Sequence, residues 1–176
     1  KTHYYGGIKK YQWTTIPLAI HGVIVQADGK KINVNIGEDE NDPVFTITDL
    51  LPHLAMEQME KKLKDGVSGE DLNLLIGSIP YEDTEITERV KLNILKILND
   101  KYGMTEKDLL SSELEIVPAF NAKSLGFDKS MVAAYGQDDK ICAYASLRAI
   151  LNVERPNKTA VCILSDKEEI GSMGNT

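Results

Sequence analysis

Two neighbouring segments decide the class of fold: Asp138-Asp139-Lys140-Ile141-Cys142-Ala143-Tyr144-Ala145-Ser146-Leu147-Arg148-Ala149-Ile150-Leu151 and, shortly after it, Thr159-Ala160-Val161-Cys162-Ile163-Leu164. Apolar residues recur in the first segment at helical spacing, which predicts an α-helix. The second segment is almost continuously apolar, as strands are when both faces of their sheet are covered. A helix followed by a buried strand is typical of an α/β unit. We therefore predict that the last third of the chain belongs to an α/β sheet domain.

The first third of the chain has the pattern of β-strands. Asp28-Gly29 is a strong hairpin-turn signal between the apolar residues 16–25 and the alternating residues 31–36. Further strands are predicted at residues 44–47 and 114–118, and residues 131–134 are short and apolar.

The middle of the chain has the pattern of helices. Apolar residues at helical spacing predict one helix through residues 51–64 and a longer one through residues 82–102, which Gly103 ends. Residues 105–110 are predicted to form a short helical turn. The expected organisation is a mixed β/α unit that is followed by the beginning of an α/β domain.

Composition excludes several classes of protein. The 176 residues are 42% hydrophobic and 27% charged, and no run of 18 apolar residues is present, so we expect a soluble protein with no membrane partner. The net charge of −7 is unfavourable for binding a phosphate backbone, so no nucleic-acid partner is expected. Cys142 and Cys162 stand in apolar surroundings, which favours reduced core thiols in a cytoplasmic protein. Because residue 1 is Lys, we also expect a fragment of a longer chain.

Two acidic clusters are candidates for chemistry. Gly136-Gln137-Asp138-Asp139 opens the predicted helix, and Asp166-Lys167-Glu168-Glu169 follows the predicted strand. Ligands bind at the carboxyl ends of strands in open α/β sheets, and gathered carboxylates repel one another unless a cation lies between them. The alternatives are a helix N-cap at Asp138 or Asp139, and a solvated loop charge at Glu168 and Glu169. The glycines that follow, Gly171 and Gly174, favour a tight turn and weaken the second alternative.

The two clusters resemble motifs of a known family. Asp166-Lys167-Glu168-Glu169-Ile170-Gly171-Ser172-Met173-Gly174 is similar to the double-glutamate motif of the aspartyl aminopeptidase family of co-catalytic zinc exopeptidases. Gln137-Asp138-Asp139-Lys140 resembles the same family's aspartate metal motif. Tyr4-Tyr5-Gly6-Gly7 is similar to the strand after the family's first metal-binding histidine. The resemblance implies a zinc-exopeptidase sheet domain, present in part and interrupted by an inserted mixed β/α dimerisation domain.

The resemblance also implies roles for individual residues. Asp138 matches the carboxylate that bridges two zinc ions, either of which another divalent metal can replace. Glu169 matches a ligand of one zinc, and Glu168 matches the general base. The family's remaining ligands lie upstream of residue 1 and downstream of residue 176, so the chain by itself is expected to be inactive.

The expected domains are residues 1–15 and 113–176 for the catalytic domain and residues 16–112 for the insert. Within the insert, the family carries a histidine that reaches a neighbouring subunit's active site. Glu57 stands at that place here, and His53 is the candidate substitute for substrate binding. The implied partners are peptide substrates and further copies of the chain, as a dimer that builds a larger assembly.

The leading hypothesis is thus a zinc-dependent aminopeptidase. A non-catalytic assembly module, and a related di-zinc exopeptidase or deacylase with another substrate, remain alternatives.

Overall fold

The computed structural model describes residues 1–167, which belong to two compact units. The first unit contains Lys1–Tyr4 and Lys9–Ala119, and the second contains Tyr5–Ile8 together with the chain from Phe120 onward. The α/β class that the sequence predicts is confirmed. No helix in the described part of the chain is both long and apolar enough to cross a bilayer.

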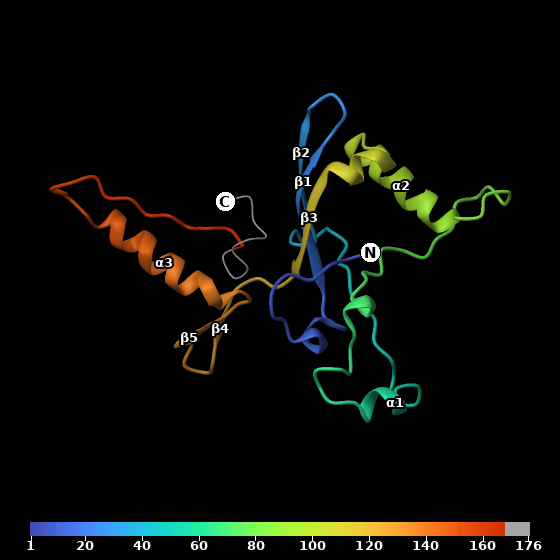
Figure 1. The fold of residues 1–176 in the computed structure, drawn as a ribbon, viewed down its shortest axis with the longest axis horizontal. Helices are drawn as coiled ribbons and strands as arrows, with labels where there is room; N and C mark the ends of the chain where they lie inside the picture. Colours follow the sequence, from blue (N-terminus) through green and yellow to red (C-terminus); the bar gives the residue numbers. More distant parts are fainter. Residues whose placement is uncertain (168–176) are drawn as a thin grey trace. The chain divides into compact units, whose positions relative to one another are not determined.

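The first unit is organised around a three-stranded antiparallel sheet. Strand β1 (Leu18–Val25) lies between β2 (Lys31–Ile36) and β3 (Ser112–Pro118), as Figure 1 shows. The β1–β2 connection is the predicted turn, in which Gly29 has a φ of +85° and Asp28 Oδ1 accepts a hydrogen bond from the Lys30 N–H at 2.9 Å. The predicted strands at residues 16–25, 31–36 and 114–118 are thereby confirmed within two residues.

The core of the first unit lies on one face of this sheet. Side chains alternate between the two faces of a strand, so Ile24 of β1 joins Val34 and Ile36 of β2 on one side. Met104 is buried against them, and Leu98 and Tyr102 from the end of helix α2 pack around the same cluster. Helix α2 (Arg89–Tyr102) thus contributes its last turn to the core.

Helix α2 ends as predicted but begins later than predicted. Gly103 follows it with a φ of +67°, and its N–H donates to the Asn99 carbonyl at 2.7 Å, which is the usual glycine termination. The expected start was residue 82. Residues 82–88 instead form a loop whose geometry depends on Arg89, because the Arg89 Nε–H donates to the Tyr81 carbonyl and the Tyr81 N–H donates to the Arg89 carbonyl.

The segment between α2 and β3 contains a buried carboxylate. The short 3₁₀ helix η3 (Glu106–Ser111) occupies the predicted helical turn, and Asp108 Oδ2 accepts hydrogen bonds from both the N–H and the hydroxyl of Thr105. The backbone bond from Thr105, followed by the hydroxyl bond, lowers the pKa of Asp108. Two further 3₁₀ turns are η1 (Lys10–Trp13) and η2 (Gly69–Asp71).

The predicted helix through residues 51–64 is wrong in extent. Only the single turn α1 (Met56–Met59) is helical, and the apolar residues Leu54, Met59 and Leu63 remain about two-thirds exposed. A short helix is marginal unless its apolar face packs against something, and within the first unit nothing covers this face. The predicted strand at residues 44–47 forms only isolated bridges, of which Phe45 with Leu18 has two backbone hydrogen bonds.

The second unit contains a hairpin and a helix. Strands β4 (Lys123–Leu125) and β5 (Met131–Ala133) pair antiparallel, and α3 (Gln137–Leu151) follows them. The helix is confirmed. Its predicted core residues are not buried, however, since Ile141 and Leu151 are about two-thirds exposed.

The prediction of a buried strand at residues 159–164 is wrong. These residues are extended chain without strand pairing, and Val161 and Ile163 are more than 70% exposed. An inner strand of a parallel sheet requires a hydrogen-bonding neighbour on each side, and residues 1–167 provide none here. For the same reason the two cysteines are not core thiols: Cys142 is exposed and Cys162 is half-buried, although both are free.

Gly22 allows β1 and β3 to approach each other. Its φ is +146°, and a Cβ at this position would lie 2.0 Å from the Glu113 carbonyl oxygen. We predict that Gly22→Ala lowers the free energy of unfolding by about 1–3 kcal/mol, because the backbone of β3 has to move. Gly7→Ala, whose Cβ would meet nothing within 4 Å, is the matched control and should be nearly neutral. Denaturant unfolding measures both, and equal stability of the two variants would contradict the prediction.

Candidate functional site

Asp138 lies where the chain enters α3. Gly136, with a φ of +66°, turns the chain into the helix, and Asp138 itself has an extended backbone with φ −88° and ψ 111°. The peptide bond between Asp138 and Asp139 is cis. The side chain of Asp138 is exposed and accepts no hydrogen bond from residues 1–167, so it is not an N-cap that binds the helix N–H groups. Both of its carboxylate oxygens are therefore free to bind a cation.

The neighbouring carboxylate has a different role. The carboxylate of Asp139 is the main cause that raises the pKa of Cys142 above its ordinary value, through hydrogen bonding and through its negative charge. The charge of Asp138 raises the same pKa as a smaller cause. The two adjacent aspartates thus differ in how strongly each acts on Cys142.

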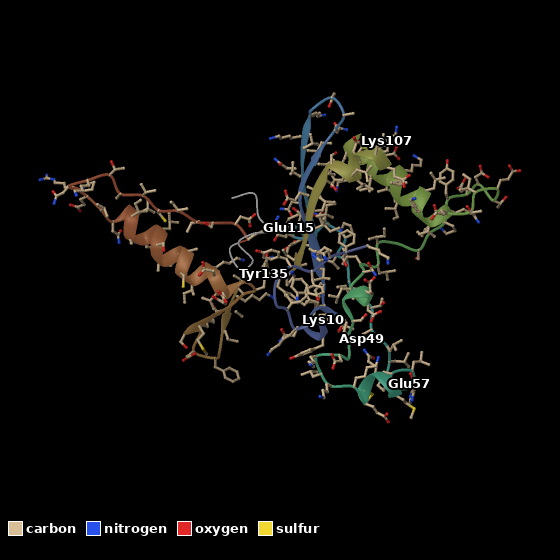
Figure 2. The ribbon with its side chains drawn as sticks, in the orientation of Figure 1. Lys10, Asp49, Glu57, Lys107, Glu115 and Tyr135 are labelled. Atoms are coloured by element: carbon tan, nitrogen blue, oxygen red, sulfur yellow. The ribbon has the colours of Figure 1, made fainter. Side chains whose placement is uncertain are left out.

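Lys140 does not neutralise Asp138. Its ammonium group lies 4.0 Å from the centre of the Tyr135 ring and donates a hydrogen bond to the Tyr135 carbonyl at 3.3 Å. Figure 2 shows Tyr135 close to the beginning of α3. The nearest lysine in the sequence is therefore directed at an aromatic face, which is a favourable cation–π contact.

The chain returns toward Asp138 after α3. Figure 1 shows residues 159–167 running back along the helix toward its beginning. Residues 163–165 line an open hollow of about 440 Å³ together with Asp139, Lys140, Cys142, Ala143 and Ser146. The segment that immediately precedes the double-glutamate motif therefore lies beside the first turns of α3.

Glu168 and Glu169 lie outside the described residues. Within residues 1–167, no three His, Cys, Asp or Glu side chains gather closely enough to hold a metal ion. Of the proposed metal ligands, Asp138 is the one that lies within the described residues. A free, exposed carboxylate fits a metal-bridging role, which requires both oxygens, but it cannot complete a zinc site, because zinc takes four ligands in structural sites and three protein ligands in catalytic ones.

His53 lies in the first unit, in a turn before α1, and its side chain is exposed. Glu57 is on α1, as Figure 2 shows, and is also exposed. Their proposed relation to a neighbouring subunit stays a prediction, because one chain alone cannot test it.

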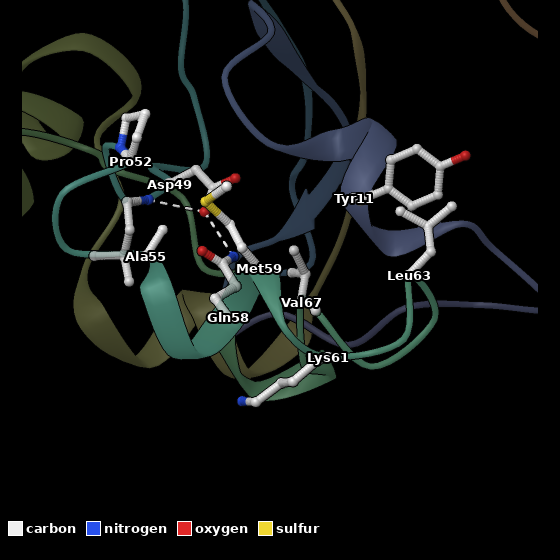
Figure 3. A pocket seen from close by; sticks show the side chains of 11 residues that line it. Tyr11, Asp49, Pro52, Ala55, Gln58, Met59, Lys61, Leu63 and Val67 are labelled. Carbon is white, nitrogen blue, oxygen red and sulfur yellow. Dashed lines mark hydrogen bonds between the residues drawn. The ribbon is translucent and has the colours of Figure 1, made fainter.

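A pocket near α1 was not expected from the sequence. It has a volume of about 270 Å³ and a mostly apolar lining that includes Tyr11, Met59 and Leu63 (Figure 3). Asp49 on its wall accepts hydrogen bonds from Gln58 Nε2 at 2.9 Å and from the Leu50 N–H at 2.8 Å. The Gln58 bond is the main reason that the pKa of Asp49 is lowered. Since these donors already engage the carboxylate, we interpret Asp49 as a structural residue.

Comparison with known proteins identifies the family. The family model of the aminopeptidase I zinc metalloproteases (M18) matches residues 1–176. The chain belongs to this family.

Individual relatives agree with this assignment. The chain is 61% identical over its whole length to a probable M18 family aminopeptidase 1 of Clostridium acetobutylicum, and 55% identical to that of Thermotoga maritima. The crystal structure of the Thermotoga maritima aminopeptidase superposes with a TM-score of 0.92 over 99% of the chain, and that of aminopeptidase I from Clostridium acetobutylicum with 0.89. The chain spans about 38% of the length of these relatives.

The Asp139–Cys142 contact can be tested through the reactivity of the thiol. Asp139→Asn removes the charge that raises the pKa of Cys142, so more of the thiol is ionised near pH 8 and alkylation should become severalfold faster. Asp138→Asn should accelerate the reaction less, because Asp138 acts only through its charge. The rate of iodoacetamide labelling, measured with chelator present in a Cys162→Ser background, checks both variants. Equal rates in Asp139→Asn and the parent would contradict the contact.

Proposed function

We propose that the protein of which this chain is part is a zinc-dependent aminopeptidase that removes N-terminal residues from peptides. In this proposal residues 1–15 and 113–176 belong to the catalytic domain and residues 16–112 form the insert. Membership of a zinc metalloprotease family supports the reaction class. The observation that links the proposal to specific residues is the exposed carboxylate of Asp138 at the beginning of α3, the helix whose first turns lie beside the returning segment 163–165.

Each acidic residue has a separate role in this proposal. Asp138 would bridge two zinc ions and Glu169 would bind one of them. Bound zinc would lower the pKa of the attacking water and would polarise the carbonyl group of the substrate. Glu168 takes the proton of the attacking water and returns it to the leaving amine. A general base has to be free of the metal and within about 2.6–3.2 Å of the water oxygen whose proton it takes, so one glutamate acts as the base and the adjacent one as the ligand.

The proposed protein is a cytoplasmic homo-oligomer whose insert contributes to subunit contacts. Exposed apolar side chains concentrate in residues 50–63 of the first unit and include Leu54, Met56, Met59 and Leu63, each about two-thirds exposed or more. We take this group of exposed apolar side chains as the candidate interface patch, because monomeric proteins rarely expose gathered apolar surface. His53 lies within the same stretch, so an interface there would place its exposed imidazole near a second subunit.

The catalytic roles predict that a change at the base and a change at a metal ligand affect zinc content differently. In the full-length protein, Glu168→Gln should lower kcat by about 10²- to 10⁴-fold while zinc content stays unchanged, because the base is lost and the ligands remain. Asp138→Ala should lower both kcat and zinc content, since a bridging ligand is lost. Release of N-terminal residues from peptides, with and without chelator, and metal analysis of the purified variants provide the measurements.

Asp139→Asn is the matched control for Asp138→Ala, because Asp139 is the adjacent carboxylate and has no metal role in this proposal. It should retain zinc. Peptidase activity that is insensitive to chelator, or that Glu168→Gln leaves intact, would remove the proposal. Assaying N-acylated amino acids beside peptides distinguishes the deacylase alternative.

The interface predicts an effect on assembly. Leu54→Glu combined with Met59→Glu should shift the full-length protein from a dimer or larger assembly toward monomer, because charges are costly in a buried apolar contact. Leu110→Glu, at a position that is 90% exposed outside the patch, should leave the assembly unchanged. Sedimentation velocity measures the sizes. A wild-type protein that is monomeric at high micromolar concentration would count against any assembly role.

A further inference from the structure

A residue from the start of the chain contacts the segment that leads into the double-glutamate motif. Tyr5–Ile8 belongs to the second unit, although the residues on either side of it belong to the first. The half-buried Tyr5 donates a hydrogen bond from its hydroxyl to the carbonyl oxygen of Lys167, 162 residues further along the chain. Gly6 has a φ of +71°, a conformation that glycine adopts readily, and it turns the chain directly after Tyr5.

The accepting carbonyl is the important atom. It belongs to the peptide group that joins Lys167 to Glu168, and a peptide group is planar. A hydrogen bond to this oxygen therefore restrains the backbone at the last described residue before Glu168. Lys167 also has a φ of +55°, which residues other than glycine rarely adopt, so its backbone has to be held by contacts of this kind.

The geometry points to Tyr5 as a positioning residue for Glu168, an inference that rests on the proposed function. Tyr5 acts through the Lys167 carbonyl and not on the substrate. It restricts the direction in which the chain enters the motif, and through that the placement of the general base. Because a displaced base loses rate more than it loses substrate affinity, the contact should affect kcat and leave KM nearly unchanged.

Tyr5→Phe in the zinc-loaded, full-length protein tests the inference, since it removes the hydroxyl and keeps the ring. We expect kcat to fall about tenfold, equivalent to about 1.4 kcal/mol of activation free energy, with KM within about twofold, and with zinc content and melting temperature unchanged. Tyr4→Phe is the matched control. Tyr4 is exposed and stacks on His3 with ring centroids 5.9 Å apart, and its loss of a hydroxyl should leave kcat unchanged.

A second measurement does not depend on activity. Amide hydrogen exchange of peptides that cover residues 165–170, measured in the full-length protein without substrate, should become faster in Tyr5→Phe and not in Tyr4→Phe. If the wild type releases no N-terminal residues, the proposed function fails, and the exchange data still decide whether the contact restrains the segment. Unchanged exchange overturns the inference. An unchanged kcat of Tyr5→Phe in an active enzyme also overturns the inference. A fall in kcat overturns it as well if zinc is lost at the same time, or if Tyr4→Phe lowers kcat equally.

Discussion

Hydrogen bonding along both edges of β1 is the constraint on which the first unit depends. β1 is paired with β2 on one side and with β3 on the other, and β3 begins 87 residues after β1 ends. The chain between β2 and β3 therefore has to leave the sheet and return to it. The cluster around Met104, together with the Asp108 cap, holds the end of that excursion against the sheet. Gly22 is required because the two strands approach too closely at this point for a side chain.

Exposed apolar surface has a different meaning in each unit. In residues 50–63 it lies on a segment with little regular structure and is suited to contact with another subunit. In α3 and residues 159–164 it belongs to the pattern of a helix and a strand in an α/β sheet domain, a pattern that requires neighbouring strands. The match of 99% of the chain to about 38% of the solved aminopeptidase structures fits this second interpretation.

The candidate site shows how adjacent identical residues acquire different chemistry. Asp138 and Asp139 have the same side chain, and the start of α3 distinguishes them: Asp138 has an extended backbone, and Asp139 is the main cause of the raised pKa of Cys142. The contact of Tyr5 with Lys167 adds a restraint from the opposite end of the chain. Local sequence thus supplies the functional groups and the difference between the two aspartates, and a contact distant in sequence restrains the segment before the double-glutamate motif.

The sequence alone determined the elements whose signals are local: the Asp28-Gly29 hairpin, the end of α2 at Gly103, the helix of α3 and the motifs that identified the family. It did not determine the structure of residues 51–64 or 159–164. Periodicity shows which face of a helix or strand is apolar, but not whether another element covers that face. Only the tertiary structure joined Tyr5 to Lys167. Hydrogen bonds of this kind depend on how the chain folds back on itself, which residue spacing does not encode.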